Sequence, residues 1–136
     1  MPDETLLAFD YGVKKIGVAL ANTLTRHAKP LTIITDERRD LRFQAIAAIM
    51  AEWQPDRVVV GLPLTTDGGE QLATTQARRF ANQITGRFGV AVELVDERGS
   101  SLEAQATLGT HQPDDAVAAA IILQRYLDAS DQDVPS

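Results

Sequence analysis

The chain has 136 residues, 44% of them hydrophobic, a length and composition that predict one compact domain over residues 1–136 with its own core. It contains no cysteine and only two histidines, which excludes a disulfide framework, a thiolate zinc site, a cysteine nucleophile and a histidine-rich metal centre. Its net charge of −6 argues against a general electrostatic binder of nucleic acid or anionic membranes, so contacts with phosphates are expected to be local or metal-assisted.

The first half of the chain is predicted to form four strands and one helix. Three short runs rich in β-forming residues, separated by polar turns, indicate a meander. Asp40 is a candidate N-cap, and apolar residues recurring every three or four positions after it predict an amphipathic helix that ends before Pro55. A β-branched run without alternation then indicates a strand covered on both faces. The predicted strands cover residues 5–10, 16–21, 30–35 and 57–62.

In the second half of the chain, helices alternate with one strand. An apolar stripe predicts a helix that Gly86 or Gly89 ends, and a terminal helix begins at Asp114 or Asp115. Strands first and alternation afterwards predict an α/β fold, a mixed five-stranded sheet with helices on both faces. The predicted segments are helices over residues 73–88 and 100–108, a strand over 90–95, a terminal helix to about residue 127 and a frayed acidic tail over 128–136.

The hydropathy of the chain bears on its location. Its apolar runs are shorter than the ~20 residues that a membrane helix needs. The first ten residues are acidic and carry no cationic segment of the kind that opens a secretion signal. The sequence therefore predicts a soluble, cytoplasmic protein without a membrane partner.

Three carboxylates stand where the predicted secondary structure changes. Asp10 ends the first strand, Glu97 follows the last strand, and Asp114 or Asp115 opens the final helix. Neighbouring strands could bring these acids to one edge of the sheet, where their mutual repulsion would require a divalent cation. Oxygen ligands without sulfur suit Mg²⁺ or Mn²⁺, and such a cation could activate water for attack on a phosphodiester.

Each of these acids also has an ordinary structural interpretation. Aspartate is a common helix cap, so Asp114 in particular could serve the terminal helix alone. Asp10 could belong to a turn, and Gly12 could serve that turn or equally let the backbone pass close to a metal or phosphate. Asp96 could be a solvated or salt-bridged neighbour. The spacing of the three acids alone does not distinguish a shared metal site from three independent capping or turn residues.

Five stretches, in order along nearly the whole chain, carry a family resemblance. They are LAFDYG at 7–12 with KIGVA at 15–19; VVGLPL at 59–64 with DG at 67–68 and Glu70; RFAN at 79–82 with GRFG at 86–89; DER at 96–98 with SS at 100–101 and EA at 103–104; and DxxAAxxIL at 115–123. With them the chain resembles the YqgF-like family, described as Holliday junction resolvases or pre-16S rRNA nucleases within the RNase H-like superfamily. The resemblance implies an RNase H-like fold and hydrolysis of phosphodiester bonds.

The resemblance also implies which acids form the site. By position, Asp10, Glu97 and Asp115 would hold the metal and carry the catalysis. The family register favours Asp115 over Asp114, because the alanines and the Ile-Leu pair follow Asp115 at the family spacing. Two departures lie beside this site: the loop before Asp115 is short and lacks the lysine usual in the family, and Gly99 replaces a larger residue.

Basic residues near these acids are candidates for nucleic-acid binding. Lys14 and Lys15 lie in the first interstrand turn, and Arg98 adjoins the predicted acidic site, so all three could contact phosphates. The alternatives are solvated lysines in a turn and a structural salt bridge for Arg98. Trp53 and Phe80 lie on apolar helix faces, which predicts core packing and not base stacking.

The leading functional hypothesis is a metal-dependent nuclease that processes the 5′ end of pre-16S rRNA. Its expected partners are structured RNA and the ribosomal precursor particle, and its expected state is a monomer or weak homodimer. A branched-DNA resolvase is the first alternative and would need a symmetric dimer. The others are a non-catalytic nucleic-acid or ribosome-assembly module, favoured by the acidic balance, and a nucleotide-binding fragment of the actin and sugar-kinase type, which Asp10, Gly12 and Gly17 resemble.

Overall fold

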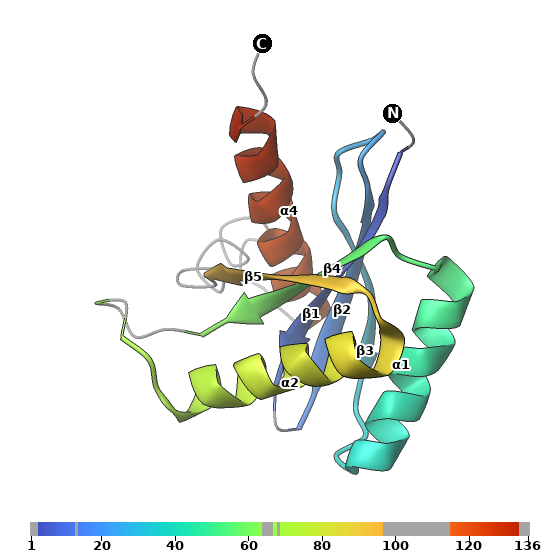
Figure 1. Ribbon diagram of the computed structural model, residues 1–136, viewed down its shortest axis with the longest axis vertical. Helices are drawn as coiled ribbons and strands as arrows, with labels where there is room; N and C mark the ends of the chain where they lie inside the picture. The colour runs from blue at the N-terminus through green and yellow to red at the C-terminus, as the bar shows by residue number, and fades with distance from the viewer. Residues whose placement is uncertain (1–2, 13, 64–66, 68, 97–114, 134–136) are drawn as a thin grey trace, which may run out of the picture.

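The fold is seen in a computed structural model that describes residues 3–12, 14–63, 67, 69–96 and 115–133 (Figure 1). The predicted helix over residues 100–108 lies outside these residues. The elements are β1 (Thr5–Tyr11), β2 (Ile16–Asn22), β3 (Lys29–Ile34), α1 (Arg39–Trp53), β4 (Arg57–Leu62), α2 (Leu72–Phe88), β5 (Ala91–Asp96) and α4 (Asp115–Asp133).

The five strands form one mixed sheet in the order β3-β2-β1-β4-β5. Short turns make β1, β2 and β3 an antiparallel meander, whereas α1 and α2 provide the crossovers that allow β1, β4 and β5 to run parallel. The predicted fold class is therefore confirmed. Because β1, β4 and β5 are parallel, their carboxyl ends lie at the same edge of the sheet.

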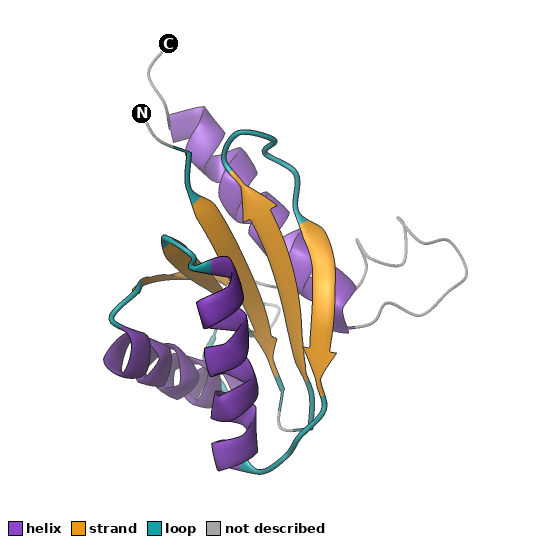
Figure 2. Cartoon of the chain, turned by 90° about the vertical axis from the view of Figure 1, so that its right-hand side faces the viewer, coloured by secondary structure: helices purple, strands orange, loops and turns teal. Residues whose placement is uncertain are grey.

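The sheet separates α1 and α2 on one face from α4 on the other (Figure 2). Residues alternate between the two faces along β1: Leu7 and Phe9 join the core under α1 and α2, whereas Leu6 and Ala8 join the core under α4. As predicted, Phe80 is buried; the half-buried Trp53 packs against the same core.

Two helix ends differ from the sequence prediction. Asp40 is not an N-cap: the N-cap is Arg38, so α1 begins two residues earlier than predicted, and Asp40 lies in the first turn with an ion pair of 3.1 Å to Arg38. A carboxylate in the first turn of a helix still interacts favourably with the helix dipole. The sequence prediction that Asp40 stabilises the start of this helix is therefore reasonable, but the position assigned to it was wrong. Gly89, with φ of 64°, is the residue that ends α2, whereas Gly86 lies within the helix.

The terminal helix continues to Asp133, past the predicted end near Leu127. Side chains hold this second half against the rest of the protein. Arg26 donates to the Leu127 carbonyl over 2.7 Å, and Gln124 bonds both Ala28 N at 3.0 Å and Asp128 Oδ1 at 3.2 Å. The bonds of Arg26 and Ala28 to α4 anchor the helix as far as Leu127, immediately before the segment whose polar composition predicts fraying.

A polar cluster fixes α4 to the amino end of β4, at the edge of the sheet opposite Asp10. Arg57 Nη1 donates to the Tyr126 hydroxyl over 2.6 Å, and this hydrogen bond raises the pKa of Arg57. Glu4 and Glu93 lie 3.8 and 3.9 Å from the same guanidinium. Arg57 is therefore a permanent cation with a structural task.

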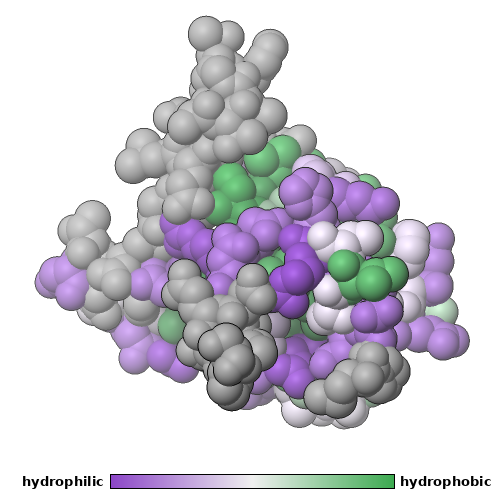
Figure 3. Space-filling model, turned by 90° about the horizontal axis from the view of Figure 1, so that it is seen from above, coloured by the Kyte–Doolittle hydropathy of each residue, from purple (hydrophilic) through white to green (hydrophobic). Residues whose placement is uncertain are grey.

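The described surface is mainly hydrophilic. Seen from above, hydrophilic side chains surround smaller hydrophobic areas (Figure 3). Large hydrophobic side chains are exposed at Leu24, Leu72 and Leu94, which lie apart in the chain, in the turn after β2, in α2 and in β5. Among the described helices, we find none with the length and apolar character required to span a bilayer.

Candidate active site

Asp10 lies near the carboxyl end of β1 and is half-buried. Ala8 and Leu6, two and four positions earlier, face α4, and alternation places Asp10 on that face too. The next residue, Tyr11, packs against the opposite core under α1 and α2. The end of β1 thus presents a carboxylate to one side of the sheet and an aromatic ring to the other.

The first turn of α4 rests on the backbone of β2 directly beside Asp10. Asp10 pairs with Gly17 across the antiparallel ladder, so both residues face the same side. A Cβ at Gly17 would collide with the carbonyl oxygen of Asp115 and lie 2.8 Å from Ala116 N, closer than real Cβ atoms come. Glycine is therefore required at position 17. Because Gly17 is the cross-strand partner of Asp10, the contact places Asp115 next to Asp10 on this face of the sheet.

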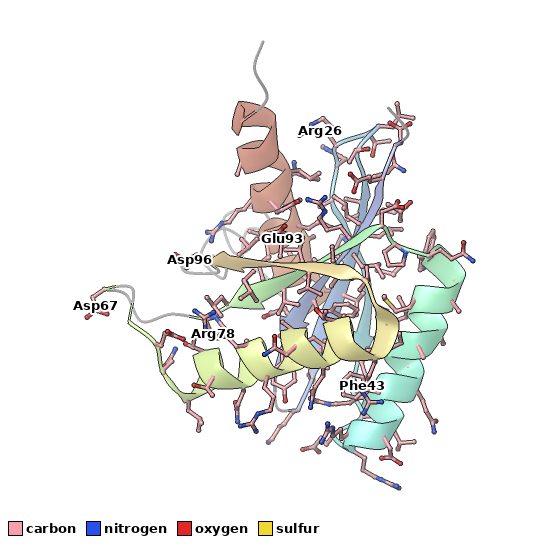
Figure 4. The ribbon with its side chains drawn as sticks, viewed as in Figure 1. Arg26, Phe43, Asp67, Arg78, Glu93 and Asp96 are labelled. Atoms are coloured by element: carbon pink, nitrogen blue, oxygen red, sulfur yellow. The ribbon has the colours of Figure 1, made fainter. Side chains whose placement is uncertain are left out.

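The end of β5 reaches the same edge and is fixed to α4. Leu62 of β4 pairs with Asp96, the last residue of β5, which stands at the tip of that strand (Figure 4). Arg125 Nη1 donates to the Asp96 carbonyl oxygen over 2.9 Å. Val95 packs on the α4 face. Glu97, two positions after Val95 in the sequence, follows this anchored strand end directly.

The structure thus brings together two of the three predicted carboxylates, Asp10 and Asp115. Glu97, Arg98 and the alternative acid Asp114 lie outside the described residues, so their predicted roles stay predictions. Within the described part of the chain, no group of three acidic, histidine or cysteine side chains is positioned to hold a metal ion. A three-carboxylate site would therefore need an acid from outside the described residues, and Glu97 is the predicted one.

The turn after Asp10 carries two of the three predicted basic residues. Lys14 and Lys15 are both exposed, between the end of β1 and the start of β2. A Cβ at Gly12 would lie 2.6 Å from the Lys15 carbonyl oxygen, so Gly12 serves the tight backbone of this turn. The two exposed lysines thus lie at the same sheet edge as Asp10, and their contact with phosphates stays a prediction.

Two residues that sequence analysis did not identify help to shape this edge. Arg125 anchors the end of β5, as described above. Thr74, fully buried in the first turn of α2, accepts a hydrogen bond from Gln71 N over 3.0 Å and donates to the carbonyl oxygen of Pro63, just after β4. A capping-box pattern at Gln71 and Thr74 is a local signal, but the partners Pro63 and Asp96 are determined by tertiary packing.

Comparison with known proteins agrees with this architecture. A family model described as RuvX, Holliday junction resolvase, matches residues 4–129. A Bordetella avium protein named "Putative pre-16S rRNA nuclease" is 72% identical over 128 residues, covering 94% of this chain and 98% of that protein. A Paraburkholderia phytofirmans protein of the same name is 52% identical over 135 residues, covering 96% and 92% of the two chains.

Solved structures share the fold at low sequence identity. Thermus thermophilus RuvC matches with a TM-score of 0.56 and 17% identity, over 94% of this chain and 96% of that chain. The fowlpox virus resolvase, solved with Holliday junction DNA, matches with a TM-score of 0.60 and 12% identity, over 93% and 98%. The RNase H-like fold expected from the sequence is confirmed. The matched residues and the close relatives show that the chain belongs to the RuvX family, whose model is described as Holliday junction resolvase.

Proposed function

We propose that this chain is a metal-dependent nuclease that hydrolyses phosphodiester bonds in pre-16S rRNA. The observation that carries the proposal is the contact of Gly17 with the first turn of α4, which gathers Asp10 and Asp115 at one end of the sheet. The curated relatives described above, 72% and 52% identical, support RNA as the substrate because they carry the name "Putative pre-16S rRNA nuclease".

The donor set suits a hard divalent cation such as Mg²⁺ or Mn²⁺. Asp10 and Asp115 offer only oxygen atoms, and two ionised carboxylates at one edge repel each other unless a cation lies between them. In our proposal Glu97 supplies the third carboxylate. When bound, the cation would stabilise negative charge on the scissile phosphate and lower the pKa of a water molecule.

The remaining residues of the site would position the nucleic acid. Lys14 and Lys15 would contact phosphates of the bound strand from the turn after β1, and Arg98 would do so from the segment after β5. Arg125 would keep the end of β5, and with it Glu97, against α4 through the hydrogen bond to the Asp96 carbonyl oxygen. The cytoplasmic location and the monomer or weak homodimer stay predictions from the sequence.

Branched DNA is the second candidate substrate, favoured by the description of the matching family model. Resolution of a four-way junction cuts two strands symmetrically, which requires a dimer with two sites. A non-catalytic role in ribosome assembly is a third possibility. The three possibilities predict different products from the same assay.

We would incubate the protein with a labelled RNA that spans the pre-16S 5′ region, beside a four-way DNA junction, with Mg²⁺, Mn²⁺ or EDTA. The proposal expects cleavage of the RNA with metal, and loss of cleavage in folded Asp10→Asn and Asp115→Asn variants. Asp114→Asn is the matched control, expected to retain activity and to lose at most about 1 kcal/mol of stability as a helix cap.

Each contrary outcome contradicts one part of the proposal. Cleavage of the junction alone would favour branched DNA. Absence of cleavage by folded wild-type protein that still binds RNA would favour the assembly module. An inactive Asp114→Asn variant beside an active Asp115→Asn variant would transfer the metal-binding role to Asp114.

A further inference from the structure

A cavity of about 260 Å³ opens between the start of α1 and the middle of α2, on the face of the sheet opposite α4. Its base consists of aromatic rings: Tyr11 and Phe43 lie 4.8 and 6.1 Å from Phe80, measured between ring centroids. Phe43 stands where α1 and α2 approach each other (Figure 4). Because Tyr11 follows Asp10 in β1, this cavity adjoins the strand end that carries the candidate active site.

The cavity is basic although the chain is acidic. Arg39, Arg42 and Arg79 line it, and Glu37 is the one acidic residue among the described residues of its wall, so the lining carries a net charge of +2 in a chain of −6. A fourth guanidinium, that of Arg87, lies 4.0 Å from the centre of the neighbouring Phe43 ring. Such a local concentration of cations attracts anionic ligands.

One of these arginines is held in place by the protein itself. Arg42 is 6% exposed, its Nε donates to the Asp36 carbonyl oxygen over 2.5 Å, and its guanidinium lies 5.6 Å from the centre of the Tyr11 ring. A buried, oriented guanidinium loses less conformational freedom when it contributes to a ligand site.

The other two arginines differ from their immediate neighbours in the chain. Arg38 pairs with a carboxylate on α1 at 3.1 Å, and Arg78 pairs with Glu70 at 2.8 Å. Arg39 and Arg79, which line the cavity, are exposed and have no side-chain hydrogen bond or ion pair within the part of the chain that the structure describes. At the start of α1 and within α2 there is thus one neutralised arginine outside the cavity beside one available arginine that lines it.

Amide side chains complete the chemistry of the wall. Gln76 and Gln83 line the cavity one turn before and one turn after Arg79 and Phe80. Guanidinium groups match phosphate oxygens in a bidentate geometry, and amides can bond the sugar or base next to a phosphate. The aromatic base gives the cavity an apolar wall against which a ribose or base could pack.

We propose that this cavity binds a backbone phosphate of the nucleic-acid substrate, at a position removed from the scissile bond. The inference rests on the proposed function in requiring a nucleic-acid substrate. Asp10 and Tyr11 are consecutive and face opposite sides of the sheet, so a strand that bends around the end of β1 would reach both sites. The cavity would then strengthen binding of the nucleic acid and fix its position along the protein, and the carboxylates would carry out the hydrolysis.

The test compares two double variants with the same change of charge. Arg39→Gln/Arg79→Gln removes the two available arginines of the cavity, and Arg38→Gln/Arg78→Gln removes their neutralised neighbours on the same helices. The Kd of a fluorescein-labelled RNA spanning the pre-16S 5′ region would be measured by anisotropy at several salt concentrations. EDTA in the buffer prevents cleavage, and circular dichroism verifies the fold of both variants.

We expect the cavity variant to bind RNA at least about tenfold more weakly and to reduce the slope of log Kd against log salt by about 1 to 2, as for one or two lost phosphate contacts. The control variant should change Kd by less than about threefold, the effect of net charge alone on association. Equal effects of the two variants on Kd and on slope would overturn the proposal.

Two further outcomes separate related possibilities. Adenosine monophosphate is the probe for a free phosphate ligand, with arginine side-chain NMR signals as readout. If it shifts the Arg39 and Arg79 signals while the cavity variant binds RNA normally, the ligand is a free nucleotide and the proposal is wrong. If wild-type protein cleaves no RNA but the cavity variant still loses affinity selectively, the nuclease proposal fails and the cavity proposal stands.

Discussion

Replacement of Gly17 by alanine tests the contact that gathers the candidate carboxylates. The new methyl group would collide with the backbone of Asp115 and Ala116, which cannot rotate away as a side chain could. The start of α4 would have to retreat by on the order of 1 Å, because interiors packed this densely hold no spare volume for a methyl group. Overpacking of this kind costs about 1–3 kcal/mol, and we expect the upper end of that range.

The same displacement should reduce catalysis more than it reduces stability. A misplacement of about 1 Å at a catalytic group can cost on the order of 100-fold in rate. A domain with about 5–15 kcal/mol of stability remains largely folded after losing about 3 kcal/mol, so the lost activity would report the position of Asp115 and not unfolding. Urea denaturation measures the stability, and the metal-dependent RNA cleavage assay measures the activity.

Gly86→Ala is the matched control. Gly86 lies within α2, and a Cβ there would meet nothing within 4 Å. Alanine in a helix interior should stabilise the protein by about 0.5–1 kcal/mol and leave cleavage unchanged. The reasoning is refuted if Gly17→Ala keeps the free energy of unfolding within about 0.5 kcal/mol of wild type, the usual range for a surface substitution.

Three further substitutions test the packing around the site. Phe80→Ala, which removes a ring shared by the core and the cavity, should lower the free energy of unfolding by about 3–5 kcal/mol in urea denaturation; a loss below 1 kcal/mol would contradict the packing. Thr74→Val should cost about 1–3 kcal/mol in the same assay because the Pro63 carbonyl oxygen loses its donor, whereas the exposed Thr75→Val should be nearly neutral. Arg125→Met should weaken Mn²⁺ binding, measured calorimetrically; unchanged affinity would show that Arg125 does not position Glu97.

The separate roles of the two sheet faces explain why the carboxylates and the cavity can be tested independently. Asp10 and Asp115 lie on the α4 face, whereas Arg39 and Arg79 lie on the face of α1 and α2. Within the part of the chain that the structure describes, Arg39 and Arg79 have no side-chain hydrogen bond or ion pair, so the effects on stability of substitutions on the two faces should add. A combination of Asp10→Asn with the cavity variant would therefore lose cleavage and affinity by separate causes.

The sequence by itself determined most of the secondary structure, because strand and helix periodicity is local. The β-branched run at residues 57–62 predicted β4 with the observed bounds, and the apolar stripe predicted α2 to within one residue. The ends of α1 and α4 were predicted less well. Asp40 was assigned to the cap position, and α4 runs past its predicted end near Leu127, where Arg26 and Gln124 bond to partners far away in the sequence.

The sequence also selected the candidate acids, but only the tertiary structure decided which of them meet. Asp10 and Asp115 approach because β1 pairs with β2 in one register and because Gly17 lets α4 lie on the strand. The same holds for the arginines: Arg78 and Arg79 are equivalent by composition, and only the packing of α2 against α1 directs Arg79 to the cavity. Local patterns specify which face a residue occupies, whereas register and the close approach of backbones determine which distant faces come together.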